Sequence, residues 1–269
     1  MEGPPPIPTG QTPPPTPTLA PEAKAPTMSL GARLLNVFAI PGEVFEDIKG
    51  SRSSAANWLV PALILALVGA VSVFVLFSQP NILQQVREQQ SQVFEQKVKA
   101  GKMSQDDADK AMAMVDKFST PTVIKVAGAF GAITVSFLRV LWWGFVLWVF
   151  GRLFFKAAVG FPKTLEIAGL SMMIVVLGTI VGMLLMVNLQ TMGASPSLAL
   201  AVKDFDVHRK SHLAMGAANI FSFWLIGVLS LGLAKVANVP FLRAAWLVFG
   251  FWLVQESLLI GIGLGQMAL

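Results

Sequence analysis

The chain has 269 residues, of which 54% are hydrophobic and only 13% are charged. Soluble globular domains usually carry about 25% charged residues, so the composition excludes an ordinary soluble enzyme and predicts that many apolar side chains face lipid. The sequence has no cysteine, which excludes disulfides and thiolate metal sites, and its net charge of +5 fits basic residues at membrane surfaces better than nucleic-acid binding.

The N-terminal part of the chain divides into a tail and a juxtamembrane segment. Residues 1–28 are rich in proline, which lacks an amide donor and fixes φ, so we predict a disordered, extended tail. Residues 29–57 follow as two short amphipathic helices, the first capped by Ser29 and the second opened by Pro41. We expect this pair to lie on the membrane surface at the foot of the first span.

Residues 58–265 are predicted to form a membrane domain of five spanning helices. Each span is poor in charge and has at least the roughly 20 residues that a bilayer crossing needs, and the second is longer than required. The polar stretch 79–121 breaks at Gly101 and continues with a capping box from Ser104 to Asp107, which predicts a helical hairpin outside the bilayer. The fold class is therefore an all-α polytopic bundle. The predicted spans are residues 58–77, 126–155, 165–189, 213–235 and 241–264.

The basic residues of the short loops predict the orientation. Five lie in or beside the loops after spans two and four, and three lie between spans three and four: Arg152, Lys156, Lys163, Lys235 and Arg243 against Lys203, Arg209 and Lys210. Cytoplasmic loops carry an excess of Lys and Arg, so the N-terminus is predicted to be cytoplasmic. For a bacterial protein, this orientation predicts a location in the cytoplasmic (inner) membrane.

Two charges fall inside the predicted spans, Arg139 in span two and Glu256 in span five. A charge at the bilayer centre costs on the order of 3 kcal/mol or more unless it is compensated. We expect the two residues to pair or to share a polar cavity, with Gln255 and Asn219 nearby. Such a pair is either a clamp that fixes helix register or a site for an ion, a proton or a lipid head group.

The loop after span three contains the only histidines, His208 and His212, together with Asp204 and Asp206. Two histidines four apart share one face of a helix, and with carboxylates they could bind zinc. Basic residues intervene, and the glutamate of a metalloprotease motif is missing. We therefore interpret the segment as a charged interfacial loop, and we predict no metal site and no cofactor.

Small residues recur within the spans at spacings that let helices approach closely. Packing inside the bundle is the default interpretation, and assembly of a homo-oligomer is the alternative. The residues are Gly128, Gly131, Ala132, Gly178, Gly182, Gly261 and Gly265.

The order of motifs resembles the Yip family (Ypt-interacting proteins). The run Pro41-Gly42-Glu43-Val44-Phe45-Glu46-Asp47-Ile48 follows an amphipathic helix and precedes a span opened by Trp58, as at the entrance to a Yip domain. The hairpin sequence at 103–108, the turn at 160–164 and the end of span four at 232–236 resemble bacterial members.

The resemblance covers residues 30–265 and implies a non-enzymatic, multi-pass membrane protein with a cytoplasmic N-terminus. In eukaryotes the family is linked to vesicle traffic and Rab-type GTPases, although the proline-rich tail and the hairpin depart from the eukaryotic pattern. The leading hypothesis is a membrane-organising or trafficking-type scaffold that contacts lipid and protein partners. Its predicted partner contacts are Phe38, Pro41, Phe45 and Ile48. The alternative is a small transporter or channel component that uses Arg139 and Glu256.

Overall fold

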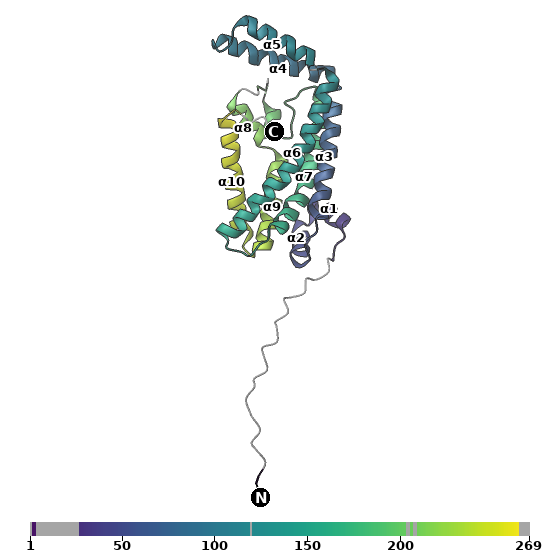
Figure 1. Ribbon diagram of the computed structural model, residues 1–269, viewed down its shortest axis with the longest axis vertical. Coiled ribbons are helices and arrows are strands. Elements are labelled where there is room, and N and C mark those ends of the chain that lie inside the picture. The colour runs from purple at the N-terminus through teal and green to yellow at the C-terminus, as the bar shows by residue number, and fades with distance from the viewer. Residues whose placement is uncertain (1, 4–26, 119, 203–204, 207–208, 264–269) are drawn as a thin grey trace.

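The computed structural model describes residues 2–3, 27–118, 120–202, 205–206 and 209–263, and within these residues the chain is helical without a β-strand. Five helices are long and apolar enough to cross a membrane, which confirms the predicted all-α, five-span fold (Figure 1). They are α3 (Ala56–Leu76), α6 (Pro121–Val149), α7 (Phe161–Leu189), α9 (Ile220–Ala237) and α10 (Phe241–Gly261). Most of the predicted disordered tail, residues 1 and 4–26, lies outside the described residues.

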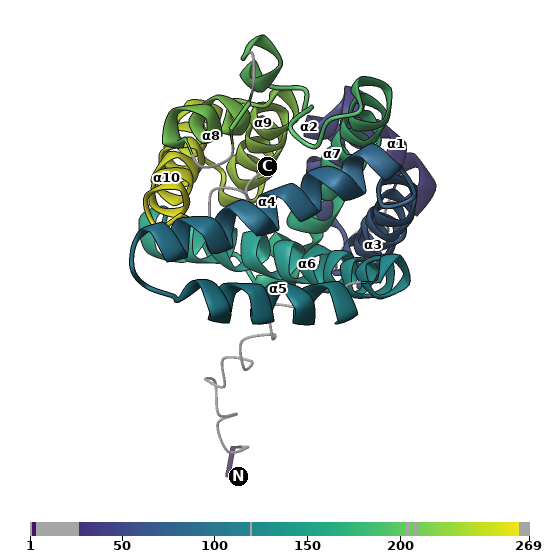
Figure 2. The same ribbon diagram turned by 90° about the horizontal axis from the view of Figure 1, so that it is seen from above.

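Two pairs of helices that are not candidate membrane spans lie at opposite ends of the bundle. The short helices α1 (Leu30–Ala39) and α2 (Pro41–Gly50) lie at the end nearest the N-terminus, and α4 (Pro80–Lys99) and α5 (Gln105–Phe118) lie at the other end (Figure 1). Seen from above, α4 and α5 run side by side across that end (Figure 2). The molecule therefore has an α1–α2 end and a hairpin end.

The helix pair α1–α2 is anchored to the bundle. The Ser29 hydroxyl accepts a 3.2 Å hydrogen bond from the Ala32 amide, so it caps α1 as predicted. Val37, Phe45 and Ile48 are fully buried in the main hydrophobic core. The apolar side of the pair therefore packs on protein, and its predicted position at the membrane surface stays a prediction.

The hairpin follows the sequence prediction closely. The Asp107 amide donates to the Ser104 hydroxyl at 3.1 Å, and that hydroxyl donates to the Asp107 carboxylate at 2.7 Å. Gly101 has a φ of 66°, a left-handed conformation that glycine adopts without steric cost. The Gln85 side chain of α4 then bonds the segment after α7, accepting from the Met192 amide and donating to the Gln190 carbonyl.

Span four differs from its predicted range of 213–235. The structure has two helices there, α8 (Lys210–Ala217) and α9, separated at Ala218 and Asn219. Asn219 is extended, and its side-chain oxygen accepts a 2.9 Å hydrogen bond from the Phe221 amide, so it caps α9. The apolar run from 213 to 217 concealed this break.

Span two begins five residues before its predicted start at 126, because Thr120 caps α6 and Pro121 occupies its first turn. It continues beyond α6 as a π-helical turn, η1 (Phe150–Phe154). One further short element, the 3₁₀ helix η2 (Leu198–Ala201), precedes α8.

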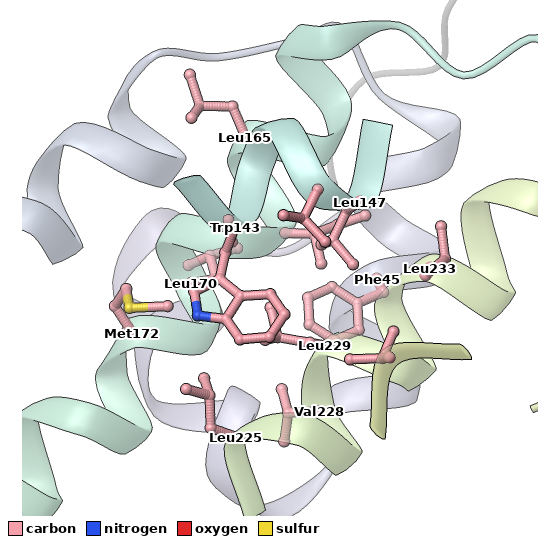
Figure 3. Close-up of a cluster of buried hydrophobic side chains, with 14 of the residues drawn as sticks. Phe45, Trp143, Leu147, Leu165, Leu170, Met172, Leu225, Val228, Leu229 and Leu233 are labelled. Carbon is pink, nitrogen blue, oxygen red and sulfur yellow. The ribbon is translucent and has the colours of Figure 1, made fainter. Parts of the chain in front are cut away.

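A dense apolar core fills the bundle toward the α1–α2 end. The side chains labelled in Figure 3 come from α2, α6, α7 and α9 and pack around Trp143. Many of them have no solvent exposure, which is the close packing expected of a protein interior. They include Phe45, Leu147, Leu170, Met172, Leu229 and Leu233.

Glycines mark the closest helix contacts. A Cβ at Gly169 of α7 would lie 2.3 Å from the Trp58 backbone, so only glycine allows α3 to approach there. Among the predicted small residues, Gly128 faces Val73 and Gly178 faces Phe221, at positions where a Cβ would be about 3 Å from the neighbour. Gly182 differs, because a Cβ there would meet nothing within 4 Å.

Candidate functional site

A cavity of about 300 Å³ lies inside the bundle, between α3, α6, α7, α9 and α10. Its walls come from the last turns of α3 and α7, the first turns of α9 and the second half of α10, so it lies toward the hairpin end. Arg139, Asn219, Gln255 and Glu256, the four polar residues that the sequence singled out, all line it.

The two charged residues share the cavity without forming an ion pair. Glu256 is 8% exposed, and its Oε2 atom is buried with no hydrogen-bond partner among the described residues. The Arg139 guanidinium forms no hydrogen bond or salt bridge with any residue that the structure describes, and its interaction with Glu256 is a longer-range electrostatic attraction. Each charge therefore retains unused hydrogen-bonding capacity inside the bundle.

Several neutral polar side chains of the cavity already form hydrogen bonds within the protein. The Gln255 side-chain oxygen accepts a 2.8 Å hydrogen bond from the Trp142 indole, and the Asn219 oxygen caps α9. The Ser72 and Thr179 hydroxyls donate to carbonyls one turn back on their own helices. The amide nitrogens of Gln255 and Asn219 and the Ser222 hydroxyl form no hydrogen bond with the described residues, so they are free to bind beside the two charges.

Most of the remaining lining residues are apolar, apart from Ser195 and Ser222. Trp143, Phe221 and Trp252 contribute aromatic surface, and Met183 and Met186 contribute flexible side chains. A few convergent polar groups on an otherwise apolar wall are typical of small-molecule sites.

A second buried charged cluster lies at the α1–α2 end, and here every charge is paired. Arg33 donates to Asp47 through Nη2 at 2.8 Å and Nε at 3.0 Å, and to the Asn57 oxygen through Nη1 at 3.0 Å. Asn57 donates onward to Glu166 at 3.0 Å. The side chains of Arg33, Asp47 and Glu166 are only 5%, 6% and 1% exposed.

Lys163 completes this cluster from the start of α7. Its Nζ atom donates to the carbonyls of Ile48 and Ser51, both at 2.7 Å, and lies 3.6 Å from the Glu166 carboxylate. The other Glu166 oxygen accepts from the Ser54 amide at 2.8 Å. The end of α2 is thereby tied to the third membrane span by charge-assisted hydrogen bonds.

Asp47 is held in its charged form. Burial raises the pKa of its carboxyl, but hydrogen bonds from the Thr27 hydroxyl and amide, from Arg33 and from the Met28 amide outweigh burial and lower the pKa from 3.8 to about 2. The aspartate therefore remains an anion at any physiological pH.

The sequence reasoning missed this cluster. Arg33 stood alone on an otherwise apolar stripe, and Asp47 stood in the proline-led run, so each resembled an ordinary solvated residue. The available signal was Glu166, an acid placed inside the third predicted span with Lys163 three residues before it. A charge in such a position requires a partner.

The predicted partner contacts are distributed between core and surface. Phe45 and Ile48 have no exposure, so they anchor α2 and are not available on an outer face. Phe38 is half-buried, with its ring centroid 6.0 Å from that of Trp224, and Pro41 is half-buried at the start of α2. Within the α1–α2 pair itself, the exposed large apolar side chains are Leu35, at 71%, and Ile40, at 39%.

The predicted weak metal candidates are not brought together in the part of the chain that the structure describes. His208, like Asp204, lies outside the described residues. His212 accepts a 2.9 Å hydrogen bond from the Asp206 amide through Nδ1, and its ring lies beside Phe205. Among the described residues, no group of three or more potential His, Cys, Asp or Glu ligands is assembled.

Comparison with known proteins identifies the family. The model of the Yip1 domain matches residues 35–262, which include every described membrane span and the second half of α1. Comparisons with curated proteins and with solved structures gave no match. Because the match covers most of the chain and the fold is a five-helix membrane bundle, the protein belongs to the Yip1 family of multi-pass membrane proteins.

Proposed function

We propose that the protein is a non-enzymatic membrane scaffold whose α1–α2 end is a fixed platform for protein partners. The observation that supports this function is the fully paired buried cluster of Arg33, Asp47, Asn57, Lys163 and Glu166, which ties both short helices to the membrane bundle. A binding surface held rigidly loses little conformational entropy when a partner docks. Membership of the Yip1 family, which is not known for enzymatic activity, agrees with a scaffold.

The platform offers a mixed surface. Leu35 and Ile40 are exposed apolar side chains on the outer side of α1 and at the α1–α2 junction, and Glu43 and Glu46 are exposed acids on α2. Exposed apolar residues bordered by charge are typical of protein interaction surfaces. Phe38 and Pro41 contribute the half-buried floor between them.

The platform is proposed to face the cytoplasm of a bacterial inner membrane. The short connections at the α1–α2 end, after η1 and after α9, carry or adjoin the larger set of basic residues that the positive-inside rule counts. Lys49, Arg52 and Arg33 belong to the same end, whereas the hairpin is long and nearly charge-balanced and so has little influence on orientation.

A scaffold is favoured over a channel because the cavity ends at a layer of closely packed apolar side chains. The cavity borders on Trp143 and Ile226, and the core beyond them contains Leu147, Leu170 and Leu229, all fully buried. A conducting pathway would need polar lining through that layer.

Site-specific photo-crosslinking in native membranes tests the platform. A crosslinker replacing Leu35 or Ile40 should capture the same protein partner, and Leu35→Glu should lower the yield from position 40 severalfold. The control position is Met114 on α5, which is 66% exposed at the opposite end and should not capture that partner. Identical products from Met114, or a yield at position 40 unaffected by Leu35→Glu, would contradict the proposal.

A further inference from the structure

The cavity between α6 and α10 contains two charges that none of the described residues satisfies by a hydrogen bond or an ion pair. Glu256 Oε2 is buried without a partner, and Arg139 forms no hydrogen bond or ion pair with the described residues. A buried charge is ordinarily paired, because an unpaired charge in a low-dielectric interior is strongly unfavourable. The contrast with the paired cluster of Arg33 and Asp47 shows that this fold is able to pair charges where they are structural.

The two charges also select the chemistry of a ligand. An anion alone would satisfy Arg139 but would be repelled by Glu256, and a cation alone would be repelled by Arg139. A molecule with an anionic group and an ammonium group satisfies both, and the site stays neutral overall. The free amide nitrogens of Gln255 and Asn219 add two donors for the anionic group.

The apolar part of the lining suits a ligand with an apolar portion, and the small volume suits a compact head group. Aromatic and methionine side chains form part of the cavity lining, and its volume of about 300 Å³ is at the small end of ligand sites. Gly182 keeps part of this space open, because a side chain at this position would meet nothing within 4 Å. A buried glycine beside empty space, in a bundle where other glycines are in tight contact, indicates room kept for something other than the protein.

We propose that this cavity is a binding site for a zwitterion with a phosphate or carboxylate at one end and an ammonium at the other, held by Arg139 and Glu256 respectively. An aminoethyl-phosphate group has this chemistry, and it is found both as the head group of a zwitterionic phospholipid and as a free soluble molecule. The site is independent of the platform, since it lies in the other half of the bundle and shares no residue with it.

The test measures the melting temperature of the purified full-length protein in lipid-free detergent against increasing ligand. Ligand that binds only the folded state raises the melting temperature in proportion to its affinity. The probes are short-chain phosphatidylethanolamine, phosphatidylglycerol of the same chain length, free phosphoethanolamine and inorganic phosphate. Phosphatidylethanolamine should act at concentrations about tenfold or more below phosphatidylglycerol, because only the former has an ammonium for Glu256.

The free compound identifies the source of the ligand. If phosphoethanolamine stabilises the protein as well as the phospholipid does, the site takes a soluble zwitterion. If only the phospholipid acts, the ligand is a membrane lipid. Equal responses to phosphatidylethanolamine and phosphatidylglycerol, a response to phosphate alone, or no response to any probe would overturn the proposal in favour of an anion site or a water-filled void.

Two variants assign the effect to the cavity. Glu256→Gln keeps the size of the side chain and should abolish the preference for the zwitterion, while Gly182→Leu should fill the cavity and remove the response. The matched control is Gly131→Leu on α6, another position where a Cβ meets nothing within 4 Å but which does not line the cavity. Retention of the response in Gly182→Leu, or its loss in Gly131→Leu alone, would place the binding elsewhere and overturn the assignment.

Discussion

The two buried charged clusters of this protein have opposite character. At the α1–α2 end, Arg33 donates two hydrogen bonds to Asp47 and a third to Asn57, and Asn57 in turn donates to Glu166. In the cavity, Arg139 and Glu256 have no such partners among the described residues. The comparison teaches that burial of charge alone does not reveal its role. A satisfied cluster clamps helices together, whereas an unsatisfied one is available to a ligand.

Breaking the paired cluster should have the largest effect on stability. Arg33→Ala leaves Asp47 buried without its main partner, and loss of one member of a buried ion pair costs about 3–5 kcal/mol. Denaturant unfolding of the purified protein in detergent measures this. The control is Lys110→Ala, which removes the exposed Lys110–Asp106 pair of α5 and should change stability by less than about 1 kcal/mol. Similar losses from the two variants would remove the role given to the cluster.

The contrast between packed and hollow regions predicts different responses of two glycines on the same helix. Gly169→Ala places a methyl group 2.3 Å from the Trp58 backbone, and such overpacking should destabilise the protein by about 1–3 kcal/mol. Gly182→Ala places the same group in open space and should be neutral or slightly stabilising, because alanine favours the helix. Thermal melts of the two variants compare them directly, and equal losses would contradict the difference in packing.

Asp47 gives the paired cluster a dependence on pH. Its folded-state pKa of about 2 lies below the ordinary value of 3.8, so its contribution to stability is fully present above about pH 4 and is lost as the pH falls toward 2. The expected loss is about 2 kcal/mol, from a shift of nearly two pKa units. Unfolding measured from pH 5 to pH 2 should show a steeper decline in the wild type than in Asp47→Asn. Parallel curves would mean that Asp47 is not held as an anion.

Neutralising the unpaired cluster should have the smallest effect. The double substitution Arg139→Met with Glu256→Gln removes two charges that gain little from each other, so the ligand-free protein should be unchanged or stabilised by about 1 kcal/mol. The same kind of change in the paired cluster, Arg33→Met with Asp47→Asn, should be destabilising, because the Asn57 oxygen loses its donor and the new amide at position 47 can accept through only one of its two terminal atoms. A large loss from the cavity variant would show that Arg139 and Glu256 are structural.

The sequence was sufficient for the fold where the signal is periodic or local. Five charge-poor stretches predicted five spans, and the capping residues Ser29 and Ser104 predicted the starts of α1 and α5. The predictions were less accurate where tertiary contacts decide. Asn219 ends one helix and caps the next within an apolar run, and the burial of Phe45 depends on α9, which lies almost 200 residues later in the chain.

The candidate sites show the same limit. Hydropathy alone pointed to Arg139 and Glu256, because a charge within an apolar span is conspicuous. It could not reveal whether they touch, since that depends on the rotation and depth of two helices. The cluster around Arg33 escaped notice because all of its charged members except Glu166 lie outside the predicted spans, where charges are ordinary. Its assembly depends on contacts between residues more than 100 positions apart, such as Asn57 and Glu166.

The accessibility of two serines on one helix tests the central difference between the hollow and packed halves. Ser222 lines the cavity, whereas Ser230, two turns along α9, is fully buried and donates to the Ile226 carbonyl. Because the chain has no native cysteine, Ser222→Cys and Ser230→Cys each provide a single thiol for a small membrane-permeant reagent. We predict rapid modification at 222, slowed by the zwitterionic ligand, and little modification at 230. Equal rates at the two positions, or a rate at 222 that no ligand changes, would contradict this account.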